Sequence, residues 1–280
     1  METKETNAPL EYGKPPWVFK GRQVNALYQL HLVKADTARA LIPKEFKLVE
    51  AFGYTLGGFF LANYEDSPAG IFDELVVIAG IVWNPPTSCA WAARVLVNSD
   101  KACIHGRKDV GLPSQVANFT KASLNMPSVT ALPGKKRNRF GGFLSKIGMA
   151  ESPGSMKNCM DIKVEEMENQ TAMDICRINL TAAVAAQSIT LTSSSTLARW
   201  NAVCIDSFRL RVVSPAKVSG PSSSDMDGEI ASECESSQRN ADCEDYKRDL
   251  SVSVMLSKPI LALEFNCLKM KVEAPTMVNQ

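Results

Sequence analysis

The feature that most constrains the fold is a series of short segments in which apolar and polar residues alternate, separated by turn residues. A period of two is typical of strands that bury one face, and buried strands appear as short apolar runs. The strand-like segments are 17–21, 24–33, 52–63, 74–83, 91–97, 161–168, 174–185, 188–192, 208–213, 250–256 and 261–273. The sequence therefore predicts a mostly β protein of the α+β class, with a closed or strongly curved sheet.

One short helix is predicted between the second and third of these segments. In the stretch 37–42 (TARALI), Asp36 precedes the helix as its expected N-cap and Pro43 follows it. A carboxylate at the N-cap accepts hydrogen bonds from free backbone amides, and proline cannot continue a helix.

The chain of 280 residues is expected to form a single domain over 16–280, after a flexible leader at 1–15. Two segments interrupt the strand pattern. A basic, glycine-containing loop lies within 134–157, and 214–249 is rich in serine and acidic residues. The second segment has few large apolar residues, so we expect a disordered insertion there.

Composition limits the partners. The formal net charge of +1 gives no basic excess for nucleic acid. The apolar run 75–83 is far shorter than the roughly 20 residues of a membrane span, although the basic loop leaves peripheral membrane contact open.

The N-terminal residues resemble neither a secretory signal nor a transit peptide, so a cytoplasmic location is expected. A homo-oligomer also stays open.

Metal and cofactor chemistry has no visible motif. The eight cysteines form no Cys-x-x-Cys pair, and the chain has only His31 and His105. Zinc sites use cysteine and histidine ligands at short, regular spacings. We therefore expect no metal, no cofactor and reduced thiols.

Three segments together resemble the acetoacetate decarboxylase superfamily. The first is FKGRQVNALYQLHLVKADTARALIPKEFKL at 19–48, and the second is YEDSPAGIFDEL at 64–75. The third, GRKDVGLPSQVA at 106–117, matches the pattern GR-x-x-x-G-x-P-K-K-x-A except at the two lysines. The resemblance covers 19–125. It implies a twisted, antiparallel, cone-like β-barrel with a few short helices and an internal pocket.

The resemblance also implies which residues line that pocket. Arg22 and Glu74 match the family's pocket arginine and glutamate, whereas the family's second pocket carboxylate falls on Phe59. Ser114 and Gln115 stand where decarboxylating members have paired lysines, one of which forms a Schiff base with a keto acid. Such a lysine is activated by desolvation or by a neighbouring cation. Neither Ser114 nor Gln115 can form an iminium, so no Schiff-base decarboxylase is expected.

Substitute catalytic groups are less well supported. Lys108 is the nearest lysine, but it lies six residues before Ser114 and is expected to be exposed. Ser114 as a nucleophile would need His105 as its base, and the two are close only in sequence.

Three hypotheses for function follow. The first is a protein that binds a small apolar ligand, such as a lipid, with Arg22 and Glu74 at its polar end. The second is a lysine-independent enzyme with Glu74 as general acid or base. The third is a scaffold whose pocket is filled by Phe59. In all three, Arg22 and Glu74 could instead form a structural ion pair.

Overall fold

The structure is a computed structural model that describes residues 12–21, 24–85, 87–126, 157–168, 171–180, 188–189, 199–200, 203–221 and 238–275. It contains the strands β1 (Trp17–Lys20), β2 (Val24–Lys34), β3 (Tyr54–Tyr64), β4 (Phe72–Asn84), β5 (Thr87–Val97), β6 (Ser114–Met126), β7 (Lys157–Glu168), β8 (Thr171–Leu180), β9 (Ser188–Ile189), β10 (Arg199–Trp200), β11 (Val203–Val213), β12 (Lys217–Ser219) and β13 (Lys258–Val272). The helices are α1 (Ala35–Leu41), α2 (Asp100–His105), the π-helical turn η1 (Gly106–Val110) and α4 (Gln238–Met255).

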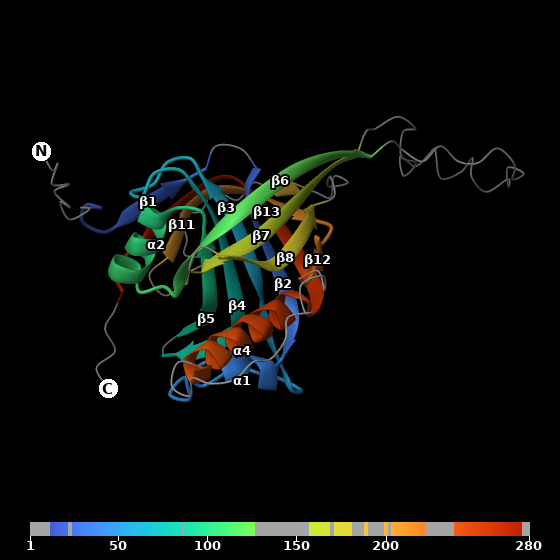
Figure 1. The fold of residues 1–280 in the computed structure, drawn as a ribbon. Coiled ribbons are helices and arrows are strands. Elements are labelled where there is room, and N and C mark those ends of the chain that lie inside the picture. Colours follow the sequence, from blue (N-terminus) through green and yellow to red (C-terminus); the bar gives the residue numbers. More distant parts are fainter. Residues whose placement is uncertain are drawn as a thin grey trace, which may run out of the picture.

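The strands form one large sheet, which confirms the mostly β prediction (Figure 1). Its order is β10-β11-β13-β2-β3-β4-β5-β6-β7-β8-β12, with β1 beside β13 and β9 beside β11. Within the described ranges, the end strands β10 and β12 are not paired with each other, so the pairings do not close a barrel.

One neighbouring pair differs from the others in direction. β5 and β6 are parallel and are joined at three paired positions, Val95–Ser114, Leu96–Gln115 and Val97–Val116. A parallel pair needs a crossover connection, and α2 with η1 provides it. Ser99 caps α2 by accepting a hydrogen bond from the Ala102 amide, and Gly111 ends η1 with a φ of 76°, which glycine adopts readily.

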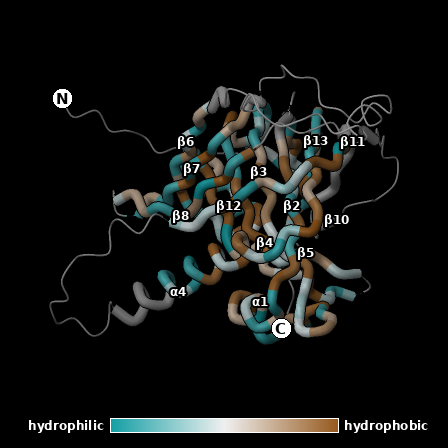
Figure 2. Tube along the Cα trace, turned by 90° about the vertical axis from the view of Figure 1, so that its right-hand side faces the viewer, coloured by the Kyte–Doolittle hydropathy of each residue, from teal (hydrophilic) through white to brown (hydrophobic). Residues whose placement is uncertain are grey.

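Two apolar clusters lie on opposite faces of the central strands. Strand residues alternate between them, as in Leu75, Val77 and Ala79 on one face and Val76 and Ile78 on the other. The first cluster, called the helix-side core, includes residues of α1 and α4; the second, called the crossover-side core, includes residues of β1 and α2. Figure 2 shows the alternation of hydrophobic and hydrophilic residues along several strands.

The helix α1 forms where the sequence predicts it, but it begins one residue before Asp36. Its N-cap is Lys34, which makes no side-chain capping hydrogen bond. Asp36 lies in the first turn and pairs with Arg39 at 2.8 Å. The helix ends at Leu41, before Pro43, as expected.

The strand prediction for 250–256 is wrong, because this segment is the last part of α4. Its alternating valines mimic a strand. The buried residues Arg248, Ser251, Val252 and Met255, however, recur at helical spacing, so one face of the helix packs against the sheet. Figure 1 shows α4 and α1 together at one end of the sheet.

The predicted segment boundaries overlap the described residues only in part. Within 214–249, the expected insertion, residues 217–219 form β12 and pair with β8, and residues from 238 onward are helical. In the helical part of this segment, helix-forming residues and the burial of Arg248 stabilise an ordered structure. Most of the leader 1–15 and nearly all of the loop 134–157 lie outside the described residues.

No helix in the described ranges is both long enough and apolar enough to cross a membrane.

Candidate functional site

The structure separates the residues predicted for the pocket. Arg22 lies outside the described residues. Glu74 and Ser114 lie on the crossover side of the sheet, because their register partners Val97 and Val95 belong to that core. Phe59 and Gln115 lie on the helix side, since Phe59 and Leu96, the register partner of Gln115, belong to the other core.

Glu74 is a half-buried carboxyl group on β4 that accepts a hydrogen bond from Tyr64. The phenol Oη donates to Oε2 at 2.8 Å. Burial raises the pKa of Glu74 to about 7, and the hydrogen bond from Tyr64 lowers it. Burial and the nearby carboxylate also hold the pKa of Tyr64 well above its ordinary value. Glu74 can therefore carry or release a proton near neutral pH.

Ser114 is fixed at the first position of β6 and is only 1% exposed. A Cβ added at Gly106 would collide with its Oγ, so the serine packs directly against the η1 backbone. Its carbonyl accepts hydrogen bonds from Arg107 Nε and from the Cys103 thiol, the latter at 3.3 Å. Ser114 therefore joins the crossover to the sheet.

His105 does not act as a base for Ser114 in this arrangement. Its Nδ1 contacts Asp109 Oδ2 at 2.8 Å, and its buried Nε2 has no partner in the described ranges. The imidazole lies among aromatic rings, with ring centroids 4.5 Å from Tyr12 and 4.9 Å from Trp17. This packing makes His105 part of the crossover-side core.

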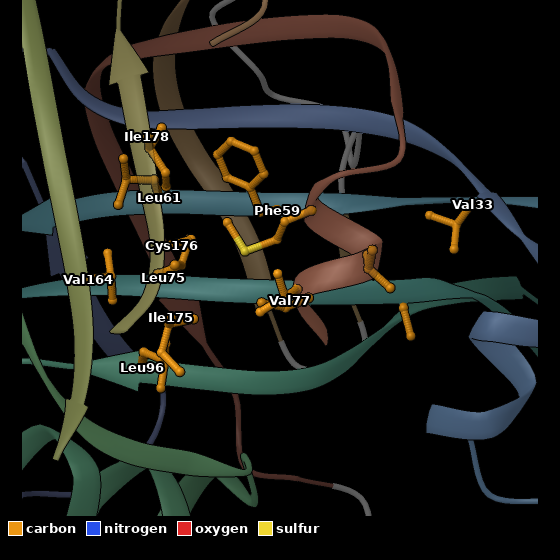
Figure 3. Close-up of a cluster of buried hydrophobic side chains, with 14 of the residues drawn as sticks. Val33, Phe59, Leu61, Leu75, Val77, Leu96, Val164, Ile175, Cys176 and Ile178 are labelled. Atoms are coloured by element: carbon orange, nitrogen blue, oxygen red, sulfur yellow. The ribbon is translucent and has the colours of Figure 1, made fainter. Parts of the chain in front are cut away.

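Phe59 is completely buried on β3 in the helix-side core. Figure 3 shows its ring in a cluster of buried side chains that includes Leu61 of the same strand and Cys176 and Ile178 of β8. The ring also meets the buried imidazole of His31 edge-on, with centroids 5.8 Å apart. Phe59 therefore fills space inside the helix-side core.

Gln115 lines a cavity of about 310 Å³ between the sheet and α4. The cavity walls come from β5, α2, η1, β6, β7 and α4. The lining residues are Arg94, Cys103, Arg107, Gln115, Val116, Glu166, Met167, Glu168, Glu244 and Arg248. This volume is at the lower end of the range of small-molecule sites, about 300–1,000 Å³. We take this cavity as the candidate site.

A buried network of charged side chains forms one wall of the cavity. Glu166 accepts from Arg94 Nη2 at 2.5 Å and from Arg248 Nε at 2.9 Å. All three side chains are at most 8% exposed. Arg248 also donates to Glu168 and Asp245. Such mutual pairing is what makes buried charges tolerable.

The sequence reasoning missed this network, although a signal for it exists. Glu166 follows Ile162 and Val164 at a spacing of two, which places a carboxylate on the buried face of a strand. A charged residue at such a position needs a buried partner of opposite charge. Arg94, within WAARVLV, shows the same conflict.

No lysine lines the cavity among the residues that the structure describes. Lys108 is exposed on η1, as expected, and Lys121 pairs with Asp73 at 2.5 Å. No cluster of three or more metal-ligating side chains occurs in the described ranges either.

Comparison with known proteins gives close relatives over the whole chain. The Solanum lycopersicum protein NEOXANTHIN-DEFICIENT 1 is 58% identical, and the alignment covers 100% of this chain and 98% of that protein. The Arabidopsis thaliana protein of the same name is 51% identical, with 99% of both chains covered. No family model matches the chain.

A solved structure shows the fold. Acetoacetate decarboxylase from Legionella pneumophila superposes with a TM-score of 0.50 at 10% identity, over 99% of this chain and 93% of that one. The fold is thus acetoacetate decarboxylase-like, as the sequence resemblance implies.

Proposed function

The chain belongs to the NEOXANTHIN-DEFICIENT 1 family, and we propose that it is required for the formation of neoxanthin, a xanthophyll that precedes abscisic acid. Identity of 58% and 51% to two family members over the full length is the observation that carries this proposal. In this role the chain acts as an accessory factor in neoxanthin biosynthesis.

The accessory role consists in binding an apolar ligand, a xanthophyll or an associated lipid, by its polar end. The cavity beside Gln115 supports this, because its small volume suits one ring of such a molecule and its walls carry polar groups. The rest of the ligand would lie outside the cavity, along the curved sheet. For this role we propose that the sheet curves into the cone-like barrel expected from the sequence.

Covalent decarboxylase chemistry is not part of the proposal. Ser114 packs against Gly106, and Gln115 presents an amide to the cavity. A Schiff base needs a desolvated amine within reach of the substrate, and neither residue has an amine.

Glu74 supports a second candidate function, a lysine-independent reaction on a carotenoid epoxide. Opening an epoxide to an allene needs an acid that protonates the epoxide oxygen and a base that takes the proton lost from carbon. A carboxyl group with a pKa of about 7 is partly protonated at neutral pH, so Glu74 would supply one of these two groups. Tyr64 orients this carboxyl group through its 2.8 Å hydrogen bond. Arg22 would serve as the electrostatic anchor.

The buried position of Phe59 supports the third candidate, a scaffold without a ligand, since its ring packs the helix-side core. Binding measurements separate this candidate from the first two.

We also propose that the chain is cytoplasmic and can associate with the plastid, where xanthophylls are made.

The test is a pigment profile of an Arabidopsis thaliana line that lacks its own family member. The line is complemented with this chain as wild type, Gln115→Met, Glu74→Gln, or Thr120→Val as a control on an exposed position of β6. We expect the wild type and Thr120→Val to restore neoxanthin and Gln115→Met to restore less.

Other outcomes decide between the candidates. Failure of the wild type to restore neoxanthin would contradict the proposed function. Loss of restoration only with Glu74→Gln, together with turnover of an epoxide by the purified chain, would favour the enzyme.

A further inference from the structure

The charges around the cavity balance. Its lining contains three arginines and three glutamates, which are Arg94, Arg107, Arg248, Glu166, Glu168 and Glu244. Glu166 is already shared by two of these arginines. At this buried wall an ionic ligand would therefore have to leave water without gaining a free counter-charge, which is costly. Arg107, which has no carboxylate partner within the described ranges, is exposed and donates to the Ser114 carbonyl instead. The lining favours a neutral ligand.

Two polar atoms in the wall have no hydrogen-bond partner within the described ranges. One is the donor Nε of Arg94, a residue that is 5% exposed, and the other is the acceptor Oε1 of Gln115. Each atom is buried, and a buried polar atom without a partner costs free energy. Both residues line the same cavity.

The sheet brings these two atoms to one side. Leu96 is the register partner of Gln115, and Arg94 precedes Leu96 by two residues on the neighbouring strand. Since side chains two residues apart share a face, Arg94 and Gln115 project on the same side of the sheet. On β7, Glu166 is the register partner of Ala117 of β6, so its side chain projects on the same side of the sheet.

We propose that this cavity binds the hydroxyl group of a neutral alcohol, which accepts a hydrogen bond from Arg94 Nε–H and donates one to Gln115 Oε1. A hydroxyl has both a donor and acceptor lone pairs, so one group can satisfy both atoms. A carbonyl or ether oxygen accepts only, and a carboxylate would also face the lone pairs of Gln115 and Glu166. The inference rests on the proposed function in taking this cavity as the ligand site.

The experiment measures binding of small probes to the full chain by ligand-observed NMR. Trimethylcyclohexanol is the probe alcohol, its methyl ether is the control without a donor, and cyclohexanecarboxylate is the anionic control. We expect the alcohol to bind about tenfold more tightly than the ether, the effect of one good hydrogen bond.

Variants then assign the hydrogen bonds. Gln115→Met removes the acceptor at similar size and should abolish the preference for the alcohol. Arg94→Lys keeps a positive charge for Glu166 but has no Nε–H, so it should weaken the preference as well. Thr120→Val, on the exposed part of the same strand as Gln115, should leave it unchanged. Thermal unfolding checks that each variant is folded.

Several results would overturn the inference. They are equal binding of alcohol and ether, tighter binding of the carboxylate, no binding of any probe, or an unchanged preference in folded Gln115→Met. Restoration of neoxanthin by the wild-type chain alongside any of these would leave the proposed function intact. Conversely, alcohol binding by a chain that cannot restore neoxanthin would overturn the proposed function alone.

Discussion

Ser114 and Gln115 are adjacent in the chain, yet their side chains lie on opposite faces of the sheet. Ser114 pairs with Val95 and packs against Gly106, whereas Gln115 pairs with Leu96 and lines the cavity. Alternation along β6 produces this separation. The two residues therefore have different tasks, one in joining the crossover to the sheet and one at the candidate site.

The contact of Gly106 with Ser114 predicts a steric conflict in Gly106→Ala. The new Cβ would collide with Ser114 Oγ and lie 3.2 Å from Ser114 Cβ. We expect a loss of about 1–3 kcal/mol in the free energy of unfolding, as in other overpacked sites. In a Ser114→Ala background the loss should be smaller, because the nearest atom is gone. Denaturant unfolding of the four chains measures this coupling, and strictly additive losses would contradict it.

The buried network predicts that Glu166→Gln is strongly destabilising. It would remove the carboxylate that Arg94 pairs with and leave Arg248 with only its exposed partners Glu168 and Asp245, at a cost of about 3–5 kcal/mol. Glu168→Gln is the matched control, because the Glu168 side chain is 54% exposed against 5% for Glu166, so its effect should be below about 1 kcal/mol. Urea unfolding compares them. Equal effects would mean that the network is not important for stability.

Removing the ring of Phe59 should open a cavity in the helix-side core. Because the residue is completely buried, Phe59→Ala is expected to lower the free energy of unfolding by about 3–5 kcal/mol. Phe52→Ala serves as the control, since Phe52 is fully exposed. Denaturant unfolding measures the free energy of unfolding of both variants. A loss below about 1 kcal/mol in Phe59→Ala would show that Phe59 does not fill the interior.

Glu74 predicts a pH-dependent stability. Its folded pKa of about 7 exceeds its ordinary value of 4.5, so between these values the folded state keeps a proton that the unfolded state has lost. The contribution of this group to stability is therefore greatest below pH 4.5 and falls as pH rises to 7. Glu74→Gln should be more stable than the wild type at about pH 8 by about 2 kcal/mol, allowing for partial exposure, and nearly equal at about pH 4. A pH-independent difference in unfolding free energy would contradict this assignment.

The hydrogen bond from Tyr64 predicts the direction of a further shift. It stabilises the charged form of Glu74, so Tyr64→Phe should raise the pKa of Glu74 above about 7. Carbon-13 NMR of the carboxyl group follows the titration. Tyr54→Phe, on the same strand but partly exposed at 38%, should leave the pKa unchanged. An unchanged pKa in Tyr64→Phe would rule out this hydrogen bond in solution.

Local sequence patterns predict the strands of this fold well, because alternation between two faces is a property of each segment. They predict 250–256 wrongly, since the face that α4 buries includes Arg248, which lies outside that segment. They also omit β6, whose side chains are mostly half-buried or exposed after Ala117. A segment without a strong apolar face gives no such signal.

The candidate site is less predictable than the strands. A family pattern identifies Gln115. The residues Arg94, Glu166 and Arg248, which line the same cavity, come from three other elements that the fold brings together. The pattern also groups Glu74 with Phe59, although strand alternation places them on opposite faces. Sequence spacing alone does not specify which faces meet across a parallel crossover.

The short parallel join between β5 and β6 has a consequence for how this family can diversify. In the part of the chain that the structure describes, three paired positions of β5 and β6 connect the half of the sheet that carries Arg94 to the half that carries Glu166. The cavity spans this narrow joint, so its width depends on the angle between the halves. Insertions or deletions in the crossover at 98–113 would thus change which ligands fit, while the lining residues on β5, β6, β7 and α4 stay the same.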